Sequence, residues 1–282
     1  MAKAGTQSGF TLIEAVMVMV ITGILFGIVA VFIARPVQGY ADAVRRAELT
    51  DAANASLRRM GRDIRSAVPN SVRQDPQFLE YLPSSGGGRY RASGVGDQLD
   101  FTAADASFDI LGPPMTFLAG DQIVVSSWNS SGTKNNAYSG NTAATDIRVN
   151  VATAQANVTN VSIAVADQHK MCPPPPDPCA TSPSQRFQVI PADQQAVTYA
   201  CEGLDTVAGD GTGTLKRYWH YGINAAQAKP PSGGSSALLV NYVSACNIDY
   251  SQGDGLVSIT LQLTRGGESV SLYHEIHVNN VP

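Results

Sequence analysis

The sequence predicts an α+β protein in which a long N-terminal helix packs on an antiparallel β body. Two contrasts between residues 1–68 and 69–282 support this prediction. Of the 26 glycines, 20 lie after residue 68, and so do 15 of the 16 prolines. Helix breakers are therefore scarce only in residues 1–68. Residues 1–68 carry 8 basic and 5 acidic side chains, whereas residues 69–282 carry 11 and 18. The chain therefore divides into a helical stem and an acidic body rich in turns.

The overall composition excludes some broad classes of protein. The chain has 282 residues, a formal net charge of −4 and 44% hydrophobic residues, so it can bury a sizeable core. It is not basic enough to coat nucleic acid, nor polar enough to be disordered. The length fits one large domain or two small ones.

The first segment of the stem is an apolar run over residues 10–34, in which Glu14 is the only charged residue. About 20 apolar residues cross a bilayer, so the run predicts one transmembrane helix. A short polar leader, residues 1–9, precedes the run and ends in Gly9. No small-residue cleavage site follows Ala34, so any cleavage should fall before the run and leave the helix on the mature protein.

Residues 35–68 are predicted to continue the helix as an amphipathic segment. Apolar side chains recur at helical spacing, at Val37, Tyr40, Ala41, Val44, Ala53, Leu57, Met60, Ile64 and Val68. One helix from Phe10 to Val68 is expected, with its second half packed on the body. Pro36 and Gly39 should weaken it locally, and Pro69 should end it. The arginines lie largely off the stripe among acidic residues without aromatics, which favours a solvated helix face over a nucleic-acid site.

Residues 69–282 are predicted to form the antiparallel β body, because short apolar alternations are separated by clusters of turn residues. The clearest hairpin turns at Gly266-Gly267. The predicted strands are Gln98–Thr102, Gln122–Ser126, Asp146–Ala152, Val158–Val165, Gln185–Val189, Ala196–Cys201, Thr214–Tyr221, Leu238–Asp249, Leu256–Thr264 and Ser269–Val278.

The four cysteines all lie in the body, and outside the cytoplasm they would form disulfides. Three pairings are possible. Cys172 and Cys179 flank a stiff proline-rich loop that a local bridge could close, which would leave Cys201 to pair with Cys246. A zinc site is disfavoured, because the chain has no CxxC pair and no suitably spaced histidine.

The sequence offers no credible active site, so the prediction is that the protein is not an enzyme and has no cofactor or metal. The HEIH string holding His274 and His277 is not HExxH, and GDGTGTLK at 209–216 lacks the GK[ST] of a phosphate loop. Asp205 and Asp210 do not have EF-hand spacing, although nothing in the sequence excludes calcium.

The string GFTLIE at Gly9–Glu14 resembles the leader junction of type IV prepilins and type II secretion pseudopilins. The resemblance implies a pilin-like fold, cleavage by prepilin peptidase between Gly9 and Phe10, and N-methylation of Phe10, leaving 273 residues. It also implies that Glu14 pairs with the Phe10 amine of a neighbouring subunit in a filament. The alternative role for Glu14 is a favourable interaction with the helix dipole, worth under ~1 kcal/mol, which would not explain a charge placed in lipid.

The stem after Arg35 and the C-terminal strings GLVSITLQL and HEIHVNNVP resemble minor pilins of the MshO type, from the mannose-sensitive haemagglutinin (MSHA) pilus system. PilW-type minor pilins and GspJ-type pseudopilins are looser matches. The resemblance implies an inner-membrane protein with a periplasmic body that helps to start a pilus and lies at its tip. Its partners would be prepilin peptidase, other minor and major pilins, the assembly platform and, indirectly, the assembly ATPase. A secretion pseudopilin and a tip adhesin are the alternatives.

Overall fold

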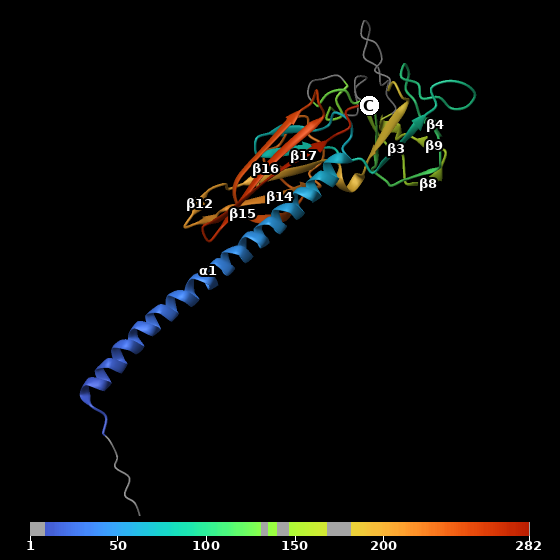
Figure 1. Cartoon of the computed structure of the whole chain (residues 1–282). Helices are drawn as coiled ribbons and strands as arrows, with labels where there is room; N and C mark the ends of the chain where they lie inside the picture. The colour runs from blue at the N-terminus through green and yellow to red at the C-terminus, as the bar shows by residue number, and fades with distance from the viewer. Residues whose placement is uncertain (1–8, 131–134, 140–146, 168–181, 282) are drawn as a thin grey trace, which may run out of the picture. The chain divides into compact units, whose positions relative to one another are not determined.

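The structure is a computed structural model that describes residues 9–130, 135–139, 147–167 and 182–281. It contains one long helix, α1 (Leu12–Arg65), followed by antiparallel sheets, so the predicted α+β class is confirmed (Figure 1). The chain divides into two compact units, Met1–Glu48 and Leu49–Pro282, and α1 crosses the boundary between them.

The helix α1 is continuous through Pro36 and Gly39. Within the second unit its predicted apolar stripe is buried, at Ala53, Leu57, Met60 and Ile64, together with Leu49. The earlier part of the stripe differs from the prediction, because Val37, Tyr40 and Val44 are exposed. The stripe that packs on the body therefore begins at Leu49.

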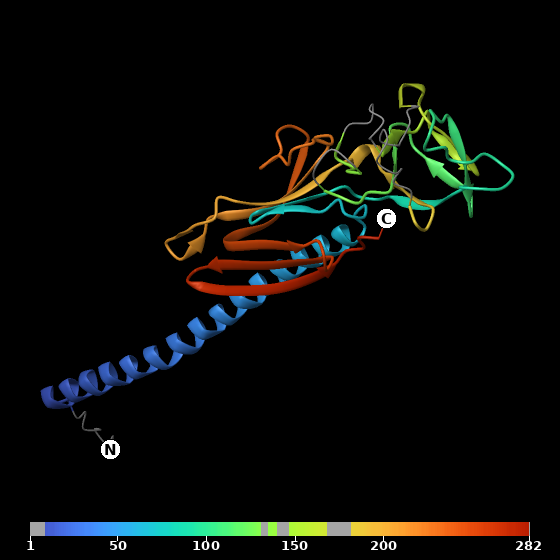
Figure 2. The same cartoon turned by 90° about the horizontal axis from the view of Figure 1, so that it is seen from above.

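A seven-stranded antiparallel sheet receives this helix face (Figure 2). The core between them joins helix side chains such as Met60 to sheet side chains such as Tyr199, Ile259 and Leu261. At Gly61 the helix lies so close to the last strand that an added Cβ would be 3.1 Å from His274 Nε2. In spatial order the strands are β1 (Arg73–Asp75), β2 (Phe78–Tyr81), β11 (Val197–Glu202), β14 (Gly213–Trp219), β15 (Ser235–Ser251), β16 (Leu256–Arg265) and β17 (Glu268–His277).

A second sheet of six strands has its own aromatic core, which includes Phe108, Phe117 and Phe187. Its spatial order is β7 (Arg148–Asn150), β6 (Gln122–Val125), β10 (Arg186–Ile190), β3 (Gly86–Tyr90), β4 (Ser107–Leu111) and β9 (Asn160–Ser162). Two small pairs complete the strands, β5 (Met115–Phe117) with β8 (Gln155–Val158) and β12 (Thr206–Val207) with β13 (Asp210–Gly211). Two short 3₁₀ turns are η1 (Val165–Asp167) and η2 (Ala192–Gln194).

The strand predictions were most accurate near the C-terminus. The β16–β17 hairpin turns at Gly266-Gly267 as predicted, with Arg265 opposite Glu268 and positive φ at both glycines. The prediction of a strand at Gln98–Thr102 was wrong, because that segment has no regular secondary structure. The strands that were not predicted are β1, β2, β3, β4, β5, β12 and β13, together with all but the last residue of β8. Of these, β3 lies in a glycine-rich segment that the sequence marks as a turn. Residue 146 of the predicted strand Asp146–Ala152 lies outside the described residues.

A partly buried polar cluster links α1 to the seven-stranded sheet. Asp63 Oδ2 accepts a hydrogen bond from the Tyr199 hydroxyl at 2.6 Å and one from Arg217 Nε at 3.2 Å. Arg217 is only 7% exposed, and its other end donates to Gln194 Oε1 at 2.5 Å. Tyr81 stacks on Tyr199, and burial raises the pKa of the Tyr199 phenol well above its ordinary value. Both phenols therefore stay neutral, and Asp63 supplies the counter-charge for Arg217.

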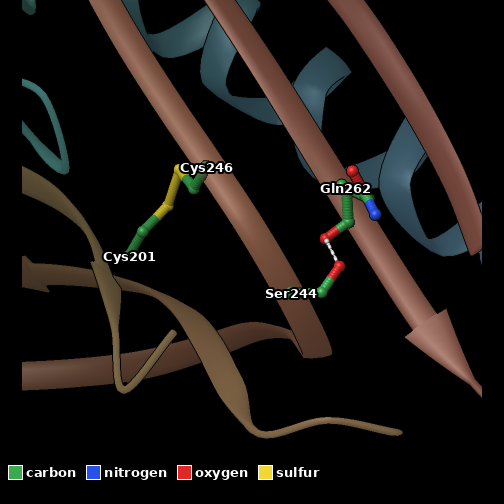
Figure 3. The surroundings of a disulfide bond; sticks show 4 residues. All are labelled: Cys201, Ser244, Cys246 and Gln262. Atoms are coloured by element: carbon green, nitrogen blue, oxygen red, sulfur yellow. Dashed lines mark hydrogen bonds between the residues drawn. A yellow bond between two sulfur atoms is a disulfide. The ribbon is translucent and has the colours of Figure 1, made fainter. Parts of the chain in front are cut away.

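The strand β15 bends in its middle, and the bend brings Cys246 to Cys201. Its first half pairs with β14 and its second half with β16, with a register shift after Val243 and a positive φ of 62° at Tyr242. The strand β14 starts at Gly213, opposite Val243, so it does not lie beside the second half of β15. Cys201 and Cys246 form a disulfide there, with their Cα atoms 6.3 Å apart (Figure 3).

Removing this disulfide should destabilise the body. The bridge closes a loop with a sequence separation of 45, for which chain entropy gives a contribution of about 4 kcal/mol. Replacing Cys201 and Cys246 by alanine together should therefore lower the urea midpoint of the full-length protein in detergent. Asn247→Ala is the matched control on the same strand, because Asn247 is exposed and directly follows Cys246. Equal midpoints for the two variants would contradict the prediction.

Candidate functional site

The candidate site is the start of α1, where the predicted junction residues lie. Gly9 and Phe10 precede the helix, an added Cβ at Gly9 would meet nothing within 4 Å, and Phe10 is 71% exposed. Thr11 occupies the N-cap position, because its carbonyl accepts hydrogen bonds from the Glu14 and Ala15 amides at 3.1 and 3.2 Å. The peptide bond between Gly9 and Phe10 is therefore open to another protein.

Glu14 is held at the third position of the helix by this cap. Its amide also approaches the Thr11 hydroxyl at 3.4 Å, so Thr11-x-x-Glu14 has the spacing of a capping box. The Glu14 side chain is exposed and makes no ion pair within the part of the chain that the structure describes. The carboxylate therefore lies in the first helical turn, available to a cation from another molecule. The cap was not predicted, although the Thr-x-x-Glu spacing in the sequence indicates it.

After Glu14 the helix is apolar as far as Ile33, and its large side chains there are exposed. Every large apolar side chain from Leu12 to Ile33 is at least half exposed. The helix is long and apolar enough to cross a membrane by length and composition. The one hydroxyl in its middle, Thr22 Oγ1, donates to Val18 O at 2.6 Å, so it needs no partner outside the helix. An exposed apolar surface of this size requires lipid or other helices around it.

Two glycines give this helix a face that another helix can approach closely. Gly23 and Gly27 are four residues apart, so they lie on the same face, and an added Cβ on either would meet nothing within 4 Å. Small residues at this spacing let helix backbones come close in membranes. The pair was not predicted, although the G-x-x-x-G pattern within the apolar run indicates it.

The other residues singled out in the sequence lie in the second unit. Cys201 and Cys246 form the disulfide of the seven-stranded sheet, whereas Cys172 and Cys179 lie outside the described residues. His274 faces Gly61 of the helix, and His277 is exposed at the end of β17. No group of three His, Cys, Asp or Glu side chains among the described residues is placed to hold a metal ion.

The comparisons with known proteins agree with the geometry of the helix start. Residues 5–30 match the family model described as the prokaryotic N-terminal methylation motif. No curated protein matches the chain, and no solved structure does. The match includes Gly9, Phe10, Glu14 and most of the apolar run. The chain therefore carries a prepilin-type N-terminus, which supports a pilin-like subunit that prepilin peptidase processes and that α1 anchors in a membrane.

Proposed function

We propose that the chain is a minor pilin-like structural subunit that acts in the assembly of a type IV pilus of the MSHA type. The methylation motif over residues 5–30, placed at the start of an exposed apolar helix, is the observation that carries this proposal. Prepilin peptidase would cut between Gly9 and Phe10 and methylate the new amine of Phe10. The exposed position of both residues before the helix supports access by that enzyme.

In this proposal the helix serves first as a membrane anchor and then as the core of a filament. Side chains that face lipid in the bilayer would face neighbouring helices after assembly, so the apolar surface stays covered throughout. Glu14 would pair with the Phe10 amine of an adjacent subunit, because a carboxylate in an apolar environment requires a cation. Other minor and major pilins would be the helix partners, with the assembly platform and its ATPase acting on the growing filament.

The assignment to an MSHA-type system, and to the initiating complex at the pilus tip, is supported by the resemblance of the stem and of the C-terminal strings to MshO-type minor pilins. In this role the protein is first held in the inner membrane with its body in the periplasm. The body lies beyond the filament core, where it contacts other minor subunits.

A chromosomal deletion of the gene tests the proposed role against its alternatives. Loss of surface pili, restored by a plasmid copy of the gene, is the expected result for an assembly subunit. Intact pili with lost secretion of exoproteins would instead make the chain a type II secretion pseudopilin. Intact pili with lost attachment would make it a tip adhesin, and either outcome would overturn the proposal.

A further inference from the structure

A polar groove crosses the exposed face of the six-stranded sheet, in the second unit. Two adjoining hollows of about 380 and 340 Å³ share Gly87 of β3 and Gln188 of β10. The first hollow reaches Arg89 and Arg186, and the second continues to Arg65 at the end of α1. The strand β3 is labelled in Figure 1. No carboxylate lines either hollow within the described residues, although residues 69–282 carry a net charge of −7.

Two arginines face each other across the strands at one end of this groove. Arg89 and Arg186 are direct partners in the antiparallel register, and both are exposed. Like charges placed directly opposite on neighbouring strands destabilise a sheet. Arg89 makes only a long contact of 3.4 Å to Gln185 Oε1, and no acidic side chain in the described part of the chain forms an ion pair with either arginine. The pair is therefore suited to an anion supplied from outside.

The floor of the groove is flat because β3 begins with glycines. Gly87 lies opposite Gln188 in the register, next to the arginine pair. A Cβ on Gly87 would lie 2.6 Å from Phe187 O and 2.8 Å from Gln188 Oε1, so a larger residue would force the two strands apart. Polar side chains at the edges, including Ser84, Ser85 and Asn279, add hydrogen-bonding groups along the second hollow.

Two buried hydroxyls lie beside the groove, just after the end of β6. Ser126 and Ser127 are 3% and 2% exposed, and neither Oγ atom has a hydrogen-bond partner among the described residues. Both residues line a small third hollow together with Arg186 and Gln188. Buried hydroxyls without partners are costly, and the third hollow, at about 10 Å³, is too small for a sugar to reach them.

We propose that this groove binds an acidic polysaccharide whose sugars carry carboxylates. The guanidinium groups of the arginines can each donate two parallel hydrogen bonds to a carboxylate. The serine, glutamine and asparagine side chains can exchange hydrogen bonds with sugar hydroxyls. The residues lining the groove include no exposed aromatic side chain on which nucleic-acid bases could stack. Duplex DNA carries one charge per about 1.7 Å, so its phosphates beyond the groove would meet the acidic body. A polyuronate carries a single carboxylate on each sugar, so it places fewer charges beyond the arginines than duplex DNA does.

The test uses the full-length protein in a nonionic polyoxyethylene detergent and a fluorescent oligogalacturonate of ten sugars. Fluorescence anisotropy should show saturable binding that weakens as salt rises, and no binding of the uncharged methyl ester of the same oligomer. The variant carrying Arg89→Gln and Arg186→Gln should bind at least about tenfold more weakly, the effect of losing ~1.4 kcal/mol. The affinity of the variant carrying Arg89→Lys and Arg186→Lys should lie between those of the original protein and the glutamine variant. Lysine keeps the positive charge but cannot make the two parallel hydrogen bonds of a guanidinium.

The matched control carries Arg58→Gln and Arg59→Gln, which remove two exposed arginines of α1 outside the groove. It should bind the oligomer within about twofold of the original protein, since distant exposed charges are screened. Equal losses in the two glutamine variants would overturn the proposal, as would binding of the methyl ester. Tighter binding of a 20-base-pair duplex than of the oligogalacturonate would also overturn it. Unchanged urea midpoints in all variants show that lost binding does not come from unfolding.

Discussion

Replacing Glu14 by leucine should leave the protein in the membrane fraction but reduce the number of pili per cell to near that of the gene deletion. The apolar helix remains long enough to span the bilayer, so anchoring is retained. In the proposed filament the neighbouring Phe10 amine would lose its counter-charge among apolar helices. Breaking a buried ion pair in this way costs about 3–5 kcal/mol at each contact. The measurement is a count of pili by electron microscopy together with a membrane-fraction immunoblot.

The variant Glu14→Gln separates the ion pair from the helix cap. Glutamine also serves at the third position of a capping box, so it keeps the local role beside Thr11 and removes only the charge. It should therefore assemble as poorly as the leucine variant. Normal piliation by Glu14→Gln alongside a defect in Glu14→Leu would assign the residue to capping and remove its proposed pairing with Phe10.

Replacing Asp63 by alanine should strongly destabilise the body. The change leaves the Arg217 guanidinium buried without its carboxylate and the Tyr199 hydroxyl without its acceptor. Stranding a buried charge costs about 3–5 kcal/mol, and this should appear as a large fall in the urea midpoint of the full-length protein in detergent. Asp51→Ala is the matched control, because it removes an exposed carboxylate from the same helix and should change the free energy of unfolding by about 0.5 kcal/mol or less.

A second substitution identifies the buried charge as the cause. Adding Arg217→Met to Asp63→Ala removes the stranded cation and should recover part of the lost stability, because apolar replacement of a buried ion pair is often nearly neutral. If Asp63→Ala and Asp51→Ala were equally stable, the polar cluster would not hold the helix to the sheet.

The features that the sequence predicted correctly depend on short-range patterns. The apolar run and the buried stripe through Leu57 and Met60 follow from helical spacing. The β16–β17 hairpin follows from two glycines between alternating segments. The predicted start of the helix, Phe10, lies two residues before the observed start of α1 at Leu12. The family model that matches residues 5–30 covers the same N-terminal motif.

The wrong strand at Gln98–Thr102 has a local cause. Leu99 and Phe101 are buried, as the alternation requires, but side-chain oxygens capture the backbone between them. Asp105 accepts a hydrogen bond from the Asp100 amide at 2.8 Å, and Asp100 accepts one from the Thr102 amide at 2.7 Å. Aspartate side chains compete in this way with strand pairing.

The missed strand β3 and its groove have a long-range cause instead. Glycines usually indicate a turn, and here pairing with β10 holds the three glycines of β3 extended. Arg89 and Arg186 are almost a hundred residues apart in the chain, and only the strand register brings them together. No pattern within a single segment of the sequence could have predicted that pair.

The most direct test of the proposed function is the N-terminus of the protein purified from cells that contain prepilin peptidase. Intact mass and N-terminal sequencing should show a chain that begins at Phe10, with one added methyl group on its amine. The same protein from cells that lack the peptidase should retain Gly9 and the residues before it. A chain that keeps residues 1–9 in the presence of the peptidase, or one that is cut after the apolar helix, would contradict the account.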